Sequence, residues 1–485
     1  MWFIVGLITF LVTLLVYNMI FRKKNFRLPP GPSGWPLVGN AFQLGSSPFI
    51  KHDEFSKTFG DMHSVSLFGH KAVVLSSIEA VKDCNLGASD NFNHRPVWLK
   101  NLTTSIAPGI AFRGVDNYID NRRFVLNNLK KRGMGKSELE PTILNEVELM
   151  LTYIEENAPL DPKDVLGNYT SNVVAQVCFE KRWDYGDEDY AKFHQAIEKI
   201  QVLSEVLGLV DFVPVLGYLP KIKTMSDENY VSVAYIRNFF RKIIETKRKE
   251  NTDGIFEGSD IVDDYLNTHK EINDEESENL VDICHDLFFA GTDTTSATLG
   301  FAVIHLINKP QFQDEFFAQI DKVLKGRDPS LSDLQNLPFV EATIQETLRV
   351  NPNVPLISHA TKNATTLRDY IIPQKTLILI NAYSVNNDEK YFEDPFTFNP
   401  HRWINEEGKF RGDLVDKLAT FGEGRRGCPG KPLARMEMFM VLVKLMQNFK
   451  LSVPAGHTVP DGTPKGGSAA IIPDSYRLMV TRRET

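Results

Sequence analysis

Apolar residues recur with helical spacing over most of the chain beyond residue 140. Spacing of i, i+3, i+4 and i+7 predicts a helix wherever it persists for several turns. The helices predicted in this way are Leu144–Glu156, Glu188–Leu207, Tyr230–Glu250, Glu276–Asn308, Pro310–Lys325, Leu337–Val350 and Pro432–Phe449. The pattern therefore predicts a mainly α-helical protein.

Two stretches instead alternate apolar and polar residues. Residues 60–80 do so through Val65 and Val73, which predicts a short strand pair turning near Gly69. Thr366–Leu379 is the second strand-like stretch. We therefore expect small β-sheets beside the helices.

The segment 1–21 carries no charged side chain and is followed at once by Arg22, Lys23 and Lys24. A helix of that length crosses the roughly 30 Å of hydrocarbon in a bilayer. The cations place the following residues in the cytoplasm. The alternative is a cleaved signal peptide, which would need a basic region before a shorter apolar core. We expect a single uncleaved transmembrane anchor and a cytosolic body.

Residues 22–39 form a basic flank and a proline-rich hinge, because Leu28–Pro32 contains three prolines that end any helix. Residues 40–485 are expected to form one large catalytic body. Within it, Leu207–Pro220 is almost continuously apolar but contains Pro214, which forbids one long helix. Two interpretations stay open, a buried core segment and a loop that touches the bilayer and covers a pocket.

Composition and charge narrow the class of protein. Of 485 residues, 42% are hydrophobic and 24% charged, which excludes a disordered chain and a small disulfide scaffold. The net charge of −8 argues against nucleic-acid binding. No C-x-x-C pair occurs among the cysteines, so a zinc knuckle or a redox dithiol is not expected. Cys84, Cys178 and Cys284 are expected to be inert.

Cys428 stands in the glycine-rich loop Phe421–Gly430, directly before a predicted helix. Glycines let the backbone fold tightly beneath a flat ligand and turn its N–H groups toward the sulfur. These donors and the helix N-terminus are expected to favour the thiolate. One thiolate cannot build a structural zinc site, but it suits the axial position of a haem iron. We expect Cys428 to be the metal ligand.

The loop matches F-x-x-G-x-R-x-C-x-G at every fixed position, and in this the chain resembles the cytochrome P-450 family. The resemblance implies that family's fold, a triangular helical body with small sheets and a long central helix over haem b. It also implies a monooxygenase that inserts one atom of dioxygen into an organic substrate. Gly133–Lys136 and Phe179–Tyr185 are most similar to the animal microsomal group. The G-x-G-x-x-G match through Gly422 lacks a βαβ unit, so no nucleotide site is expected.

The motif Ala290–Thr295 lies in the longest predicted helix. Glycine and hydroxyls that bond back to preceding carbonyls weaken a helix locally, which predicts a groove. Cleavage of an O–O bond needs protons, and a hydroxyl backed by a carboxylate can relay them. The family's [AG]-G-x-[DE]-T-T is matched here, and the resemblance implies that Asp293 and Thr294 are the catalytic residues that deliver protons to dioxygen.

Glu346 and Arg349 stand three residues apart on a predicted helix and share a face. The resemblance makes them a structural network with Arg402, from Phe398–Arg402. A carboxylate between two guanidiniums would tie the irregular segment 380–428 to the core.

Haem carries two propionates, which need cations nearby. The resemblance implies Arg426 in the cysteine loop, Tyr118 and Arg122 in place of the family's W-x-x-x-R, and His359. With Phe421 and Cys428 they form the expected cofactor-binding set. Glu180 and His401 depart from the family pattern, which has glycine and glutamate there.

Electrons must come from outside the chain, and the resemblance implies NADPH-cytochrome P-450 reductase as donor, with cytochrome b5 as a second partner, at the endoplasmic reticulum membrane. A local basic patch is expected to dock the reductase. Its members are Lys130, Lys131, Arg132, Arg425, Lys431 and Arg435.

Phe288, Phe289 and Ala290 are expected to give the substrate pocket an apolar wall. Lipophilic substrates follow, but xenobiotic, steroid, fatty acid and terpenoid are not distinguished. Two other functions stay open, a haem-thiolate isomerase or dehydratase of peroxides and a non-catalytic haem or lipid-binding protein. The isomerase would need no reductase.

Overall fold

A computed structural model describes residue 6 and residues 26–87, 89–96, 98–101, 109–112, 115–250, 258, 260–269, 273–466 and 470–484. The anchor expected at 1–21 lies outside these residues apart from Gly6, and it stays a prediction. The described part of the hinge, residues 26–39, has no helix, as its prolines require.

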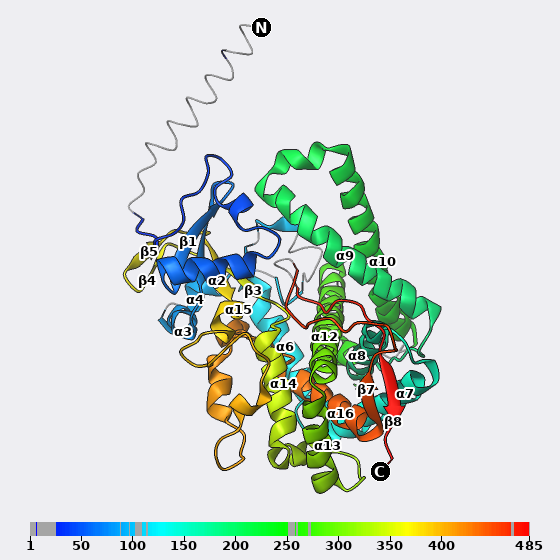
Figure 1. Ribbon diagram of the computed structural model, residues 1–485. Helices are drawn as coiled ribbons and strands as arrows, with labels where there is room; N and C mark the ends of the chain where they lie inside the picture. The colour runs from blue at the N-terminus through cyan, green and yellow to red at the C-terminus, as the bar shows by residue number, and fades with distance from the viewer. Residues whose placement is uncertain are drawn as a thin grey trace.

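Helices make up most of the described chain (Figure 1). The α-helices are α2 (Pro48–Phe59), α3 (Ile78–Gly87), α4 (Ser89–Phe92), α6 (Val115–Lys131), α7 (Glu140–Asn157), α8 (Pro162–Phe179), α9 (Glu188–Phe212), α10 (Pro220–Glu250), α11 (Ile261–Thr268), α12 (Asp274–Asn308), α13 (Pro310–Leu324), α14 (Pro338–Val350), α15 (Ala382–Asn386) and α16 (Lys431–Asn448). The 3-10 helices are η1 (Ala41–Gln43), η2 (Ser137–Leu139), η3 (Pro214–Tyr218), η4 (Leu331–Asn336), η5 (Pro400–Trp403), η6 (Gly412–Lys417) and η7 (Gly424–Arg426). The predicted helical class is confirmed.

Small sheets lie beside the helical part, as expected. The largest has the order β1 (Met62–Leu67), β2 (His70–Leu75), β6 (Leu377–Asn381), β3 (Leu356–Ala360), with β2 and β6 parallel and the other pairs antiparallel. The other sheets pair β4 (Thr365–Leu367) with β5 (Tyr370–Ile372), and β7 (Phe449–Ser452) with β8 (Met479–Arg482). The predicted turn at Gly69 has φ of +48° at Phe68 and +85° at Gly69, which suits a tight hairpin.

The long helix α12 stands in the centre of the helical part (Figure 1) and packs against α8, α10, α13, α14, α16 and β7. Its start is fixed by a capping box, in which Asn273 accepts from the Glu276 N–H and Glu276 accepts from the Asn273 N–H. Among the described helices, α12 alone is long and apolar enough to span a membrane, but 67% of its apolar window is buried inside the protein. It is a core helix.

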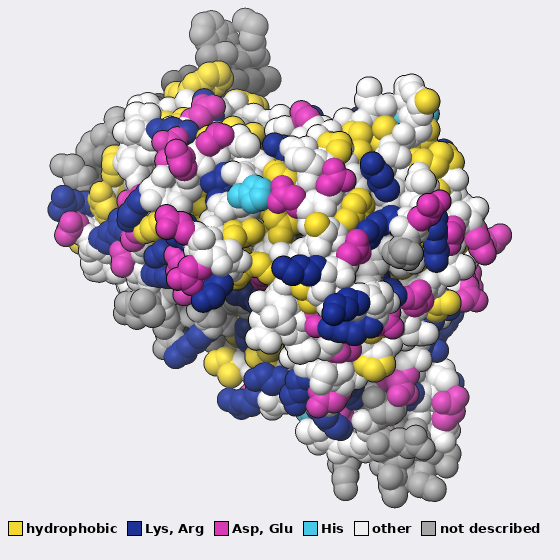
Figure 2. All heavy atoms as spheres, turned by 60° about the horizontal axis from the view of Figure 1, so that its bottom comes forward, with side chains coloured by type: hydrophobic (Ala, Val, Ile, Leu, Met, Phe, Trp, Pro, Cys, Tyr) yellow, Lys and Arg dark blue, Asp and Glu magenta, His cyan; other side chains and the backbone are white. Residues whose placement is uncertain are grey.

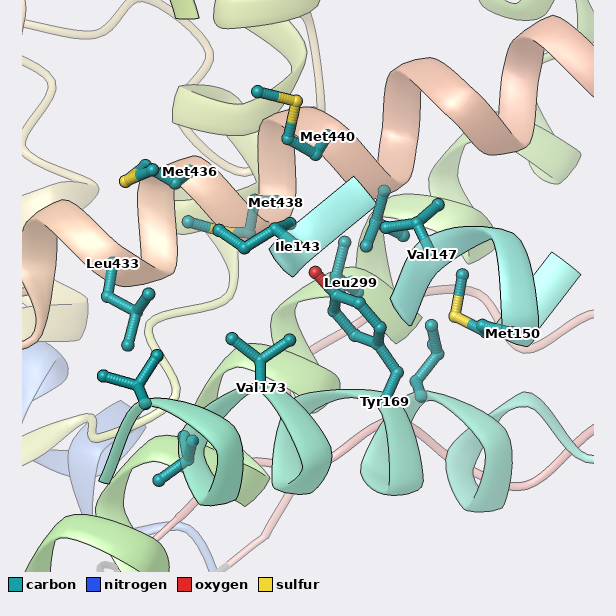
Figure 3. Packing of buried hydrophobic residues seen from close by; sticks show 14 of the residues in the cluster. Ile143, Val147, Met150, Tyr169, Val173, Leu299, Leu433, Met436, Met438 and Met440 are labelled. Carbon is teal, nitrogen blue, oxygen red and sulfur yellow. The ribbon is translucent and has the colours of Figure 1, made fainter. Parts of the chain in front are cut away.

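The core beneath α12 is built by α7, α8, α12 and α16 (Figure 3). Met438 of α16 points toward Ile143 of α7 on the side where Tyr169 of α8 lies, and Met436 and Met440 point to the opposite side of α16 within the same buried cluster (Figure 3). Flexible methionines fill the irregular gaps between helices that cross at different angles. This packing fixes the end of α16 that follows the cysteine loop.

The apolar segment 207–220 contains the end of one helix, a short 3-10 helix and the start of another helix. Helix α9 continues to Phe212, η3 spans Pro214–Tyr218, and α10 begins at Pro220 instead of Tyr230. Pro220 is the first residue of α10, where a missing N–H costs nothing. Tyr218 is 86% and Val215 65% exposed, so the buried-core interpretation of these two residues is wrong.

Candidate active site

The cysteine loop folds back on itself as its glycines allow. Gly422 has φ of +66° and Gly424 φ of +71°, both in the left-handed region that favours glycine. The Cys428 N–H donates to the Phe421 carbonyl at 2.7 Å, and the Gly427 N–H donates to the Gly424 carbonyl at 3.1 Å. These bonds present Cys428 directly before the first turn of α16.

The Cys428 sulfur has the predicted backbone donors. Hydrogen bonds from the N–H groups of Gly430 and Lys431, with the charge of Arg122, lower the pKa of Cys428 as predicted, whereas burial raises it and has the larger effect. The Cys428 side chain is nevertheless exposed. A coordinated metal would remove the thiol proton.

Thr294 and Ala290 lie on α12, and Ala290 is an exposed residue between two buried runs of the central helix. The Thr294 hydroxyl donates to the Ala290 carbonyl at 2.8 Å, so the predicted bonding back to the preceding turn is present. The helix nevertheless runs unbroken. Gly291 has a different purpose, because a Cβ there would lie 2.6 Å from Val174 of α8. The glycine lets α8 approach α12.

Asp293 points from α12 toward α9. Its Oδ2 accepts from the Gln201 side-chain amide, and its Oδ1 lies 3.6 Å from Nε2 of His194. Asp293 and Thr294 are thus adjacent in sequence, but the Asp293 carboxylate contacts Gln201 and His194 of α9. His194 and Gln201 were missed by the sequence reasoning, since nothing in their spacing marks them.

Basic side chains converge around the cysteine loop. Arg122 donates to the Gly427 carbonyl at 2.6 Å, and the Arg426 guanidinium lies over the Tyr118 ring at 3.2 Å from its centroid. Tyr118 donates its hydroxyl proton to the Arg425 carbonyl at 2.6 Å. Four of the predicted cofactor residues, Tyr118, Arg122, Arg426 and Cys428, are therefore brought together.

Arg95 belongs to the same cluster and was missed, because it stands in a loop without any periodic pattern. Burial, then the charges of Arg426 and Arg122, lower the pKa of Arg95 to about 9. Burial likewise lowers the pKa of Arg426 to about 10. The charges behind these shifts are those of the neighbouring arginines and of Tyr118. Such a cluster is suited to a dianionic ligand.

His359 completes the cluster from β3. Its Nδ1 lies 3.0 Å from the Phe92 carbonyl, and burial, followed by the charges of Arg95 and Arg426, lowers its pKa to about 3. Because the imidazole is neutral, it offers one N–H donor and adds no further positive charge.

The loop before α6 is fixed between this cluster and α12. The buried Asp286 carboxylate of α12 accepts from the N–H groups of Gly109 at 3.1 Å and Ala111 at 2.9 Å. Arg426 donates to the Ile110 carbonyl at 3.2 Å, and Arg95 donates to the Ala111 carbonyl at 2.7 Å. These bonds connect the central helix to the cysteine loop through residues 109–111.

The predicted network around Glu346 is present and fully buried. Arg349 donates to both carboxylate oxygens at 2.8 Å, and Arg402 donates to Oε1 at 3.0 Å. Trp403, which was missed, donates its indole N–H to Oε2 at 2.8 Å. Burial alone would raise the pKa of Glu346, but the two arginines and the Asn399 N–H hold it below its usual value. The carboxylate is charged and ties η5 to α14.

The predicted substrate wall divides into core and cavity residues. Phe288 is 1% exposed and packs edge-on against Trp183 and Phe193 at 5.8 and 5.0 Å, so it belongs to the core. Phe289 is partly buried and stacks on His285, while Ala290 is accessible. Of the three residues, Ala290 is the exposed one.

Several members of the predicted basic patch are neutralised. Lys131 and Arg132 both pair with Asp264, at 2.7 and 2.8 Å, and Arg435 pairs with Glu341. Lys130 is exposed on α6. On the face shown in Figure 2, Lys and Arg side chains are interspersed with Asp and Glu. Three of the six predicted members of the basic patch are therefore paired with carboxylates.

The donor set fits haem. The exposed Cys428 sulfur could bind its iron, and the arginine cluster could hold its two propionates. The described residues contain no group of three or more His, Cys, Asp or Glu that could hold a bare metal ion.

Comparison with known proteins agrees with this geometry. A family model described as Cytochrome P450 matches residues 29–480. The chain is 32% identical to Cytochrome P450 2C6 of Rattus norvegicus over 98% of this chain and 99% of that protein. It is 32% identical to Cytochrome P450 2C5 of Oryctolagus cuniculus over 93% of each, and 30% identical to Cytochrome P450 2U1 of Homo sapiens over 98% of this chain and 92% of that protein.

Proposed function

The chain belongs to the cytochrome P450 family and is a haem-thiolate monooxygenase, and we propose that it oxidises lipophilic substrates at the endoplasmic reticulum membrane with electrons from NADPH-cytochrome P450 reductase. The observation that carries this proposal is the exposed Cys428 sulfur beside the cations Arg95, Arg122 and Arg426.

Each part of the site has a task in this proposal. Haem bound through Cys428 supplies the activation of dioxygen, one atom of which enters the substrate. Arg95, Arg122 and Arg426, with His359, would hold the propionates. Thr294 presents a hydroxyl to the cavity, and Asp293 supplies the proton that the hydroxyl passes on.

A membrane position is supported by apolar side chains at one end of the molecule. Trp35, Leu37 and Phe42 are 58%, 63% and 68% exposed. The backbone at Gly39 pairs with Leu67 of β1, and Phe68 beyond it packs on Phe212 at the end of α9, which leads into the exposed η3. We infer that this surface lies against the bilayer beside the anchor, and that lipophilic substrates enter from there.

The reductase would dock on the side of the cysteine loop. With Lys131, Arg132 and Arg435 already paired, Lys130 and Lys431 are the patch members proposed to attract its acidic surface. Cytochrome b5 would compete for the same charges.

Isotope transfer tests the reaction class. The full chain, reductase and NADPH are incubated under ¹⁸O₂ with lauric acid, testosterone and 7-ethoxycoumarin as probes of three substrate classes. Incorporation of one ¹⁸O atom into a product of at least one probe, dependent on NADPH and reductase, is the expected result. Conversion of a fatty-acid hydroperoxide without NADPH, with no ¹⁸O uptake, would instead favour the isomerase or dehydratase. Binding without any turnover would favour a carrier.

A further inference from the structure

A small pocket with polar and apolar lining residues opens to solvent on the side of α12 where Asp293 points. It is bounded by α8, α9, α12 and residues 472–476, and its polar lining includes Asp161, Lys163, His194, Glu198, Gln201 and Asp293. Lys163 and Glu198 form an ion pair at the outer end, and each side chain is 39% exposed. His194 and Asp293 lie deeper, at 12% and 18%. Solvent therefore meets the outer pair first.

The contact with Asp293 favours the protonated form of His194. Burial lowers the pKa of His194, but the nearby Asp293 carboxylate and the charge of Glu198 outweigh burial and the repulsion from Lys163, so the pKa is raised. The titratable and charged groups that face it from the packed elements are Lys163 and Asp164 of α8, Tyr190 and Glu198 of α9, Asp293 of α12, and Asp474 and Tyr476 of the C-terminal segment.

Gly167 makes room for the imidazole. This glycine lies in the interior of α8, and a Cβ there would come within 3.3 Å of His194 Nε2, the atom that faces Asp293. Gln201 binds the other carboxylate oxygen, so the carboxylate is oriented from both sides by α9.

We propose that His194 is the solvent-side proton partner of Asp293, a positioning residue that holds the carboxylate and returns its proton. This inference rests on the proposed function of Asp293. The imidazolium Nε2–H bond breaks and an Asp293 O–H bond forms, which leaves both groups neutral. Water in the pocket then reprotonates His194 from bulk solvent, so each proton delivered through Asp293 is drawn from the outside of the molecule.

The charge state of His194 is tested without turnover. The full-length holoenzyme is labelled with ¹³C-histidine, and the His194 signal among the 11 histidines is assigned with His194→Gln. We expect a His194 pKa above about 6.5 that falls by about one unit in Asp293→Asn. A pKa at or below 6.5, or one that Asp293→Asn leaves unchanged, would overturn the proposal.

Turnover supplies the second readout, with 7-ethoxycoumarin or whichever of the three probes the wild type oxidises. In His194→Gln the fraction of NADPH recovered as product falls several-fold, the solvent deuterium isotope effect rises, and the pH dependence that follows His194 disappears. Gly167→Ala keeps the imidazole but displaces it, and an intermediate loss is expected. Lys163→Gln keeps the His194–Asp293 contact and removes a repelling charge, so the pH midpoint moves upward.

Retention of the wild-type product yield, isotope effect and pH profile in His194→Gln would refute the relay while leaving the monooxygenase intact. Absence of product from the wild type would instead count against the proposed function, and the histidine titration would still decide the charge state of His194.

Discussion

Burial raises the pKa of Cys428, and hydrogen bonds from the backbone lower it. A glycine-rich loop before a helix could be predicted from the sequence, and its backbone donors are present. The net pKa could not be predicted, because it depends on how much protein from distant segments surrounds the sulfur. The same holds for Arg95 and Trp403, whose partners lie in other segments. By contrast, Glu346 and Arg349 were predictable, since three residues of helix bring them together.

Glu346 gives the sharpest prediction at this scale. Glu346→Ala leaves the Arg349 guanidinium buried without its carboxylate and removes the acceptor of Arg402 and Trp403. We expect a loss of about 3–5 kcal/mol in the free energy of unfolding and failure to retain haem. Urea unfolding of the full chain in detergent and the haem-to-protein ratio measure both effects.

Glu315→Ala is the matched control. Glu315 is a half-exposed glutamate of α13 whose partner, His401, lies in the same 3-10 helix as Arg402. Its removal is expected to cost less than about 1 kcal/mol and to leave haem content unchanged. Equal behaviour of the two variants would show that the buried network has no special structural role.

At the scale of elements, several amphipathic helices were predicted, but the largely buried helix α8 was not. Helix α8 has nearly every side chain buried, so no apolar stripe marks it. Its polar residues are buried because they bind other elements: Thr170 donates to the Thr292 carbonyl at 2.9 Å, and Asn172 donates to Glu146 at 2.8 Å. The departure at Glu180 is also explained, since this C-cap of α8 has φ of +53°, which glycine adopts more readily.

The packing of α2 on β1 predicts a pH dependence of stability. Nδ1 of His52 lies 3.1 Å from Nε2 of His63, and burial lowers their pKa values to about 3 and about 4. In the unfolded chain both histidines are protonated as the pH falls below about 6.5. Their contribution to the free energy of unfolding is therefore complete above that pH and is lost as the pH falls toward 4. At pH 5 one histidine lowers the free energy of unfolding by roughly 2 kcal/mol.

His63→Gln should therefore flatten the fall in unfolding free energy between pH 7.5 and pH 5, measured by urea titration. Exposed His457→Gln is the control and should follow the wild type. His305 and His359 also have lowered pKa values, so some slope remains in His63→Gln. A slope identical to that of the wild type would exclude the His52–His63 pair as its source.

For the whole molecule, the helical class and the small sheets could be predicted, but the assembly of the site could not. Residues 95, 122, 359 and 426 come from four separate regions, and only tertiary packing brings their side chains around one loop. The resemblance to a family indicated all of these positions except Arg95. The orientation of Asp293 toward α9 and the solvent-exposed pocket also depends on tertiary packing, and no sequence motif indicates it.

The central claim is that Cys428, as thiolate, binds a haem iron in this fold. The reduced carbon monoxide difference spectrum of the purified full chain tests it most directly, with Cys428→Ala and the buried Cys84→Ala compared side by side. We predict the red-shifted Soret band of thiolate-ligated haem for the wild type and Cys84→Ala, and its loss in Cys428→Ala. A wild-type chain without this band, or a Cys428→Ala chain that keeps it, would contradict the account.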